Sequence, residues 1–173
     1  MHELAEWESF YFVIGGAAGA LIGLQFVVMT LLADKPTTIE AAKAFATPTV
    51  VYFATSLLLA ALASMPWHSL DLLAACWGAV GIAGMAYALI VARHMRRQDD
   101  YTPISSDWLF NVLMPMLGYA MLVAAASMAH GEAGLASWIA AVASLLLLLL
   151  GVRNSWEVIS YQVTVRVREH QRD

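Results

Sequence analysis

Histidine and carboxylate side chains gather in the segments that flank the apolar stretches of this sequence, where they could support metal chemistry. Neutral imidazole and carboxylate groups are suitable ligands for Zn²⁺ or Cu²⁺. The alternative is that they are ordinary solvated loop residues. The candidate ligands come from segments far apart in the sequence, and they are His2, His68, Asp71, His130 and Glu132.

A second polar group lies at the end of the last apolar stretch, in the sequence GVRNSWE (151–157). Arg153 and Glu157 are one helical turn apart, and Asn154 and Glu157 are three residues apart, so the latter two are expected to share a helix face. An amide and a carboxylate are costly to bury in lipid unless they are paired. The alternative is an interfacial anchor, since Trp and Arg are common at the membrane boundary. With polar residues from earlier stretches, the candidate pore or gate residues are Gln25, Asn111, Asn154 and Glu157.

Other polar residues within the apolar stretches are few. Those that face a helix-bundle interior would either line a hydrated path or hydrogen-bond between helices, and bonding is the commoner role. They include Thr30, Thr55, Ser56, Tyr87, Tyr119, Ser127 and Ser144.

No catalytic signature is present. The sequence has no nucleophile elbow, HExxH motif, P-loop or Gly-rich dinucleotide fingerprint. Cys76 is the only cysteine, so no internal disulfide and no thiolate-cluster metal site can form. We therefore predict no catalytic residue and no cofactor, and the net charge of −4 argues against a nucleic-acid partner.

The composition does not suit a soluble domain, so the elements that position these residues are expected to be membrane helices. Hydrophobic residues make up 61% of the 173 residues and charged residues 13%, whereas soluble domains average roughly 45–50% apolar and about 25% charged residues. A bilayer core needs about 20 mostly apolar helical residues. A single all-α membrane domain over 1–173 is predicted, with spans at about 10–32, 49–65, 70–92, 108–129 and 135–152. Residues 153–173 would form an amphipathic tail, for which a helix is favoured over a strand.

The basic residues predict the orientation of the chain. All of them lie in the first-to-second connection, the third-to-fourth connection or the C-terminal end: Lys35, Lys43, Arg93, Arg96, Arg97, Arg153, Arg166, Arg168 and Arg172. By the positive-inside rule, the N-terminus is outside and the C-terminus is cytoplasmic. Because the loops are short, consecutive helices are expected to pack as antiparallel neighbours.

Two prolines are expected to interrupt the helices. Thr47-Pro48 is expected to start the second span after a short interfacial helix over 39–46. Pro115 lies inside the fourth span, where it should kink the helix and free the carbonyl of Asn111. In lipid, a neighbouring helix or side chain must satisfy such a carbonyl.

Gly15, Gly19 and Gly23 lie four residues apart in the first span and predict a helix-packing face. Glycine has no Cβ, so another helix backbone can approach closely along such a groove. The partner would be either another helix of the same chain or a second copy.

Two hairpins of the predicted bundle are weakly alike. The sequence Ala63-Ser64-Met65 before His68 matches Ala126-Ser127-Met128 before His130. The two hairpins, spans two–three and four–five, would form a parallel repeat about an axis along the membrane normal. The alternative is chance similarity in Ala/Leu-rich sequence.

Three stretches, GLQFVV (23–28), TPTVVYF (47–53) and GVRNSWE (151–157), together resemble a group of small bacterial five-helix membrane proteins. A GxxNxW[DE]-like end to the last span recurs in that group. The resemblance implies location in the bacterial inner membrane. It transfers no catalytic or binding residue, because the group is uncharacterised.

Three functional classes remain open on the sequence. The preferred one is a non-enzymatic, self-associating integral membrane protein that conducts or transports small cations, with the lipid bilayer and further copies of the chain as partners. A ring of Glu157 carboxylates around a symmetry axis would favour cations. The second is an interaction or regulatory protein that binds a partner through its cytoplasmic tail. The third is a metal-binding protein or membrane enzyme that uses the outer His and carboxylate residues.

Overall fold

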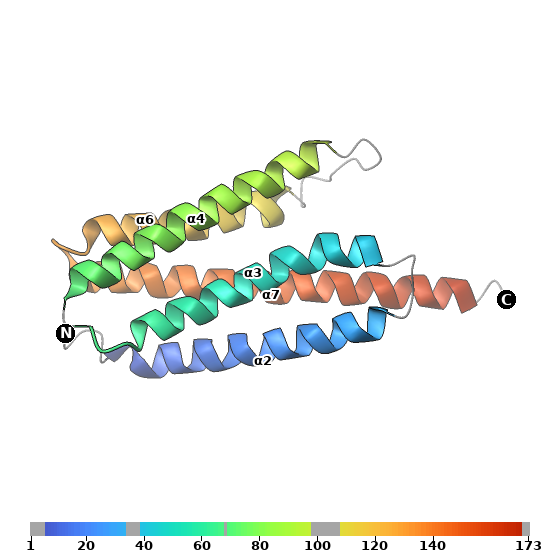
Figure 1. The fold of residues 1–173 in the computed structure, drawn as a ribbon, viewed down its shortest axis with the longest axis horizontal. Coiled ribbons are helices and arrows are strands. Elements are labelled where there is room, and N and C mark those ends of the chain that lie inside the picture. The colour runs from blue at the N-terminus through green and yellow to red at the C-terminus, as the bar shows by residue number, and fades with distance from the viewer. Residues whose placement is uncertain (1–5, 34–38, 68, 98–107, 171–173) are drawn as a thin grey trace.

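The computed structural model describes residues 6–33, 39–67, 69–97 and 108–170, and these residues form an all-helical bundle (Figure 1). No strand occurs within these ranges. The predicted all-α class is therefore confirmed. The elements are α2 (Glu8–Ala33), α3 (Ile39–Ala63), α4 (Leu70–Arg97), a π-helical turn η1 (Leu109–Leu113), α6 (Met114–Met128) and α7 (Ala133–His170).

Four segments of these helices are long and apolar enough to cross a membrane, namely Glu8–Thr30, Leu70–Arg96, Leu109–Met128 and Ala133–Glu157. They coincide with the first, third, fourth and fifth predicted spans. The second predicted span corresponds to a shorter apolar segment, Thr47–Ala63, which is part of α3. By length and composition, four helices could cross a membrane, and α3 contributes a shorter apolar segment.

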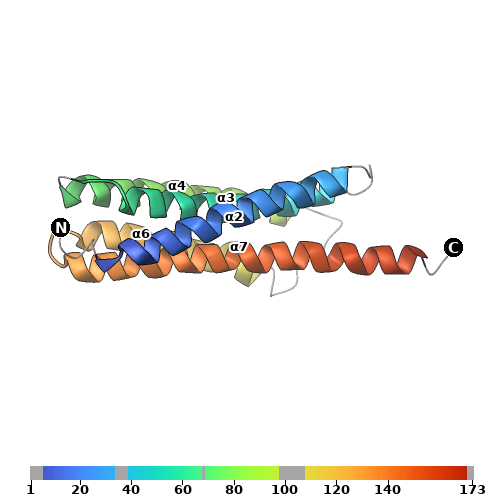
Figure 2. The same ribbon diagram turned by 90° about the horizontal axis from the view of Figure 1, so that it is seen from below.

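Helix α7 is central in the bundle. It packs against α6 on one side and α3 on the other, while α4 packs on α6 and α2 packs on α3. Figures 1 and 2 show this order, with α7 also projecting past the other helices toward its C-terminal end. Small buried residues let α7 contact neighbours on two sides, and they include Ala136, Ala140, Ala143 and Gly151.

The expectation that all consecutive helices pack together is wrong for α3 and α4, which make few contacts although a short connection joins them. The reason is that α3 buries its apolar face on α2 and α7, whereas α4 buries its face on α6. The α6–α7 hairpin, by contrast, is packed along its helices. The two hairpins of the predicted repeat therefore differ in structure.

The two ends of the bundle differ in charge. One end, which we call the acidic end, holds the start of α2, the α3–α4 connection and the α6–α7 turn, with Glu8, Asp71 and Glu132. The opposite end, which we call the basic end, carries Arg93, Arg96 and Arg153. Helix α2 begins at the acidic end and α7 ends at the basic end (Figure 1). The start of α2 and the end of α7 therefore lie at opposite ends of the bundle.

Of the two proline predictions, the one at Pro48 needs correction. Helix α3 runs without a break from Ile39 to Ala63, with Pro48 inside it, so no separate interfacial helix precedes the second span. A proline removes only one backbone donor, and the surrounding hydrogen bonds carry the helix through. At Pro115 the chain forms the π-helical turn η1 just before α6, in which Met114 N–H donates to Leu109 O five residues back.

The glycine face of α2 is split between packing and open space. A Cβ at Gly15 would lie 3.2 Å from the Cβ of Ala60 on α3, so Gly15 packs within the chain. At Gly19 and Gly23 a Cβ would meet nothing within 4 Å. Each four-residue step advances about 40° around a helix, which turns the later glycines away from α3. Of the three glycines in the predicted packing face, only Gly15 therefore packs against another helix of the same chain.

Other glycines carry the close contacts of the bundle. A Cβ at Gly84 of α4 would overlap the ring of Tyr119 on α6, and a Cβ at Gly151 of α7 would lie 2.5 Å from Cε1 of Phe53 on α3. Tyr119 is 1% exposed and Phe53 is fully buried. These two contacts, α4 to α6 and α7 to α3, depend on the absence of a side chain.

Candidate functional site

A buried polar cluster lies near the basic end of the bundle, where α7 meets three other elements. Asn154 is 5% exposed, and its Nδ2 donates to Oδ1 of Asn111 in η1 at 3.4 Å. On the next residue, Ser155 Oγ donates to Oε1 of Gln25 on α2 at 3.3 Å, and Gln25 is also 5% exposed. The structure thus brings three of the candidate pore or gate residues to one level of the bundle.

The π-helical turn shapes the η1 side of this cluster. Pro115 has no N–H to offer the carbonyl of Asn111, and the hydroxyl of Tyr52 on α3 donates to that carbonyl at 3.5 Å. From the sequence, a neighbouring helix or side chain was expected to satisfy the carbonyl that Pro115 leaves free, and Tyr52 does so. Single π-helical turns inside α-helices occur frequently at functional sites, because they re-aim side chains locally. Here the turn belongs to the segment that presents Asn111 to α7.

The charged pair of the cluster lies at its edge. Arg153 Nη2 is 2.5 Å from Glu157 Oε1, and the Arg153 guanidinium carbon lies 3.5 Å from the ring centroid of Phe110 in η1. Within the single chain Asn154 is buried and Glu157 is half-exposed. The expectation that the two share a helix face toward the bundle interior or a symmetry axis between copies stays a prediction. A three-residue step leaves them about 60° apart around the helix, which is enough to separate a buried side chain from an exposed one.

One polar atom of the cluster is left without a partner. Asn154 Oδ1 is buried and has no hydrogen bond among the described residues. A buried acceptor without a partner costs roughly 1–3 kcal/mol, and such an atom in a native structure points to a water or an ion. Trp77 Nε1 and Ser144 Oγ, elsewhere in the bundle, are likewise buried without a hydrogen-bond partner among the described residues. The Asn154 oxygen differs from them in belonging to a cluster of candidate pore or gate residues.

Hydroxyl groups continue the polar contacts toward the middle of the bundle. Ser56 Oγ lies 3.1 Å from both the carbonyl of Tyr52 and the carbonyl of Ser144 on α7. Thr55 Oγ1 lies 3.4 Å from the hydroxyl of Tyr119 on α6. Ser56, Thr55 and Tyr119 thus bond between helices as predicted. The hydroxyls of Thr30 and Ser127 instead bond to carbonyls of their own helices, and Ser144 Oγ has no partner among the described residues.

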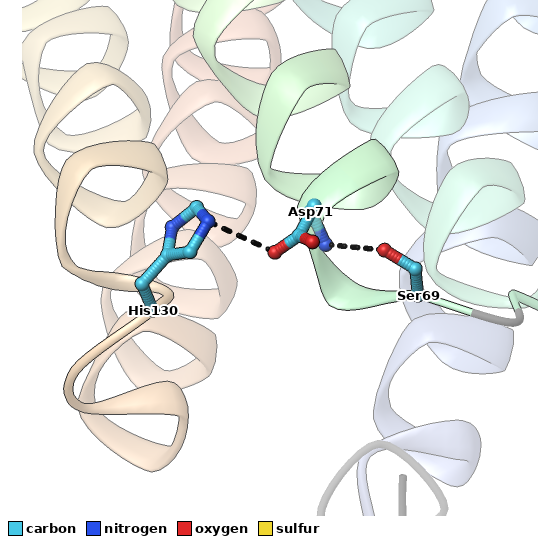
Figure 3. A network of polar contacts seen from close by, with 3 residues as sticks. All are labelled: Ser69, Asp71 and His130. Carbon is cyan, nitrogen blue, oxygen red and sulfur yellow. Dashed lines mark hydrogen bonds and ion pairs between the residues drawn. The ribbon is translucent and has the colours of Figure 1, made fainter.

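The acidic end contains a second, exposed polar contact (Figure 3). Asp71 Oδ1 lies 2.9 Å from His130 Nε2, which joins the start of α4 to the α6–α7 turn. The backbone N–H of Asp71 donates to Ser69 Oγ at 3.1 Å, so Ser69 caps α4. Both side chains of the pair are about 70% exposed, and such pairs contribute about 0–1 kcal/mol.

The predicted metal ligands are only partly brought together. Asp71 and His130 are in contact, while His2 and His68 lie outside the described residues. Within the described ranges, no group of three His, Cys, Asp or Glu side chains could hold a metal ion.

Sequence reasoning missed two members of the buried cluster, Tyr52 and Phe110. Both lie within predicted spans and have aromatic side chains typical of such segments. Neither lies at a distance in sequence from a polar residue that indicates a site. The carbonyl of Asn111, which Pro115 leaves without a helical donor, is the one signal that could have located Tyr52. Such a carbonyl needs a donor from a neighbouring helix.

The fold and the site together define an all-helical bundle that has apolar helices of membrane-crossing length and a buried amide cluster near one end. No protein-family model matches the chain, and neither a curated protein nor a solved structure shows significant similarity to it.

Proposed function

We propose that the chain is an integral protein of the bacterial inner membrane that crosses the bilayer five times. The arginines of the basic end support a cytoplasmic location for that end, with the N-terminus outside. The Thr47–Ala63 segment of α3 is about 25 Å long at 1.5 Å per residue, close to the lower limit for a crossing. The inner-membrane assignment also follows from the resemblance of the GVRNSWE segment to small bacterial five-helix proteins.

We further propose that the protein self-associates and conducts or transports small cations. The single observation that carries this proposal is the buried Asn154, whose oxygen has no partner among the described residues. Polar groups inside a membrane bundle are costly, and they commonly mark substrate or ion pathways. Open space beside Gly19 and Gly23 supports self-association, because a second helix could approach closely there.

Cation flux into liposomes that contain the purified full chain tests this function. We expect a potassium or sodium gradient to collapse faster in these liposomes than in protein-free liposomes. Mass measurement in detergent on the same preparation should give more than one copy per particle. Flux no faster than in the protein-free control would overturn the transport proposal.

A second candidate function has one specific observation in its favour. Helix α7 continues to His170, past the end of its apolar segment at Glu157, which adds about 20 Å of helix at the basic end. A helix that projects beyond a membrane bundle could bind a cytoplasmic partner. Deleting residues 161–173 should leave flux unchanged if transport is the function, whereas an interaction protein would lose its partner and show no flux in either form.

A further inference from the structure

We propose that Asn154 Oδ1, the backbone carbonyl of Asn111 and the hydroxyl oxygen of Tyr52 form a binding site for one small monovalent cation. This inference rests on the proposed transport function and names the ligand class of the buried cluster. The three oxygens come from α7, η1 and α3, so the site would join three elements of the bundle.

The first argument is the orientation of the Asn154 amide. Its Nδ2 donates to Oδ1 of Asn111 at 3.4 Å, so its own Oδ1 takes no part in that bond. That oxygen is buried and has no hydrogen bond among the residues the structure describes. A cation would satisfy it without the need for another protein donor.

The second argument is that Asn111, whose side chain pairs with the Asn154 amide, also carries a weakly satisfied backbone carbonyl. The carbonyl of Asn111 lacks the helical donor that Pro115 would otherwise provide, and the Tyr52 hydroxyl reaches it only at 3.5 Å. A hydrogen bond of this length is weak. Both the carbonyl and the phenol oxygen therefore retain lone pairs that a cation can use. Tyr52 is 1% exposed, whereas Asn111 is only partly buried.

The ligand class follows from the charge of the donors. Amide, backbone carbonyl and phenol oxygens are all neutral. Ca²⁺ and Mg²⁺ sites in proteins use carboxylates, and transition metals favour imidazole or thiolate ligands. Neutral oxygens instead replace the hydration shell of monovalent cations, as carbonyl rings do in potassium channels. The site therefore suits an alkali cation or ammonium.

The adjacent positive charge of Arg153 does not oppose this assignment. Its guanidinium lies over the ring of Phe110 and pairs with Glu157 at 2.5 Å. The carboxylate offsets part of the positive charge of the guanidinium at the neighbouring oxygens. Glu157 would in this way act as a positioning residue for Arg153 and not as a ligand.

Ion-specific thermal stabilisation of the full chain in detergent tests the site. The unfolding midpoint is measured in sodium, potassium, ammonium and choline chloride at one ionic strength. Because a bound ligand stabilises the folded state by mass action, we expect a saturable rise in the midpoint for at least one small cation over choline. Equal midpoints in all four salts would overturn the proposal, since a buried water alone gives no ion dependence.

Three variants locate the effect. Asn154→Leu should abolish the ion-dependent rise, and Asn154→Asp, which keeps the shape and adds a negative charge, should lower the half-saturating cation concentration at least tenfold. Ser127→Ala is the matched control, because Ser127 Oγ bonds only to Ala124 O of its own helix at 2.8 Å, and it should keep the rise. If Asn154→Leu does not fold, Asn154→Asp decides: an unchanged half-saturating concentration overturns the site.

Failure of the site and failure of the function give different results. Ion-dependent stabilisation at Asn154 without flux in liposomes would support the site and overturn transport. Flux together with midpoints that do not depend on the cation would overturn the site and leave transport standing.

Discussion

Asn154 on α7 and Asn111 in the π-helical turn, 43 residues apart in sequence, are joined by a hydrogen bond of 3.4 Å between their side-chain amides. Interhelical bonds of this kind in membranes contribute about 0.6 kcal/mol on average. The more important consequence is rotational. With Asn154 turned inward, Val152 and Trp156 are exposed, so the pair helps to fix the rotation of α7 about its axis.

Substitution of Gly84 by alanine should destabilise the bundle. The added Cβ would overlap the buried ring of Tyr119, and overpacking of this kind typically costs about 1–3 kcal/mol. Thermal unfolding in detergent should show a lower midpoint for Gly84→Ala. Gly19→Ala is the matched control, because a Cβ there meets nothing within 4 Å. Equal midpoints for the two variants would mean that α4 and α6 do not pack as described.

Gly19→Leu should reduce the mass of the particle in detergent without unfolding the chain. The position is open within the single chain, so the leucine side chain would only block a second helix from approaching α2. Size-exclusion chromatography with light scattering measures the mass. Ala79→Leu adds the same bulk to an exposed position of α4 and should leave the mass unchanged. An unchanged mass for Gly19→Leu would show that this part of α2 faces lipid.

Much of this architecture could be predicted from the sequence, and the limits have physical causes. Long apolar stretches specify helices, so the spans were predicted nearly to their ends. The order of helices in space was not predictable, because the α3–α4 connection constrains only the ends of the two helices, and the small residues of α7 decide which helices pack side by side.

The candidate site could be predicted only in part. Gln25, Asn111 and Asn154 stood out as polar residues in apolar sequence, and the structure places them at one level. Tyr52 did not stand out, because its role depends on the carbonyl that Pro115 leaves free on a helix far away in the sequence. The one-turn spacing of Arg153 and Glu157 already allowed for an ion pair, and the structure adds that this pair lies at the edge of the cluster with Glu157 half-exposed.

Glu157→Gln should lower cation flux several-fold and leave the oligomer mass unchanged. The variant removes the charge that compensates Arg153, whose positive field then acts on the neighbouring oxygens. Loss of this half-exposed pair should reduce stability by only about 0.5 kcal/mol. Flux and unfolding midpoint are both measured, with Glu8→Gln at the acidic end as control. A large fall in the midpoint with normal flux would assign a purely structural role to the pair, and no change in either would indicate an interfacial anchor.

The orientation can be tested with reporter fusions at the C-terminus. A reporter that is active only in the cytoplasm should be active, and one that is active only in the periplasm should be silent, because the arginines at the basic end favour retention in the cytoplasm. The reverse pattern would overturn the proposed orientation. A fusion after residue 67, in the α3–α4 connection, should give the opposite result and serves as the internal control.

The central claim, that the buried amide cluster near the basic end carries cations, is tested most directly by the rate of cation flux in liposomes that contain wild type, Asn154→Leu or Ser127→Ala at equal protein density. The account predicts flux at the wild-type rate for Ser127→Ala and a loss of at least tenfold for Asn154→Leu, in protein that keeps its fold and oligomer mass. Flux at the wild-type rate in folded Asn154→Leu would contradict it.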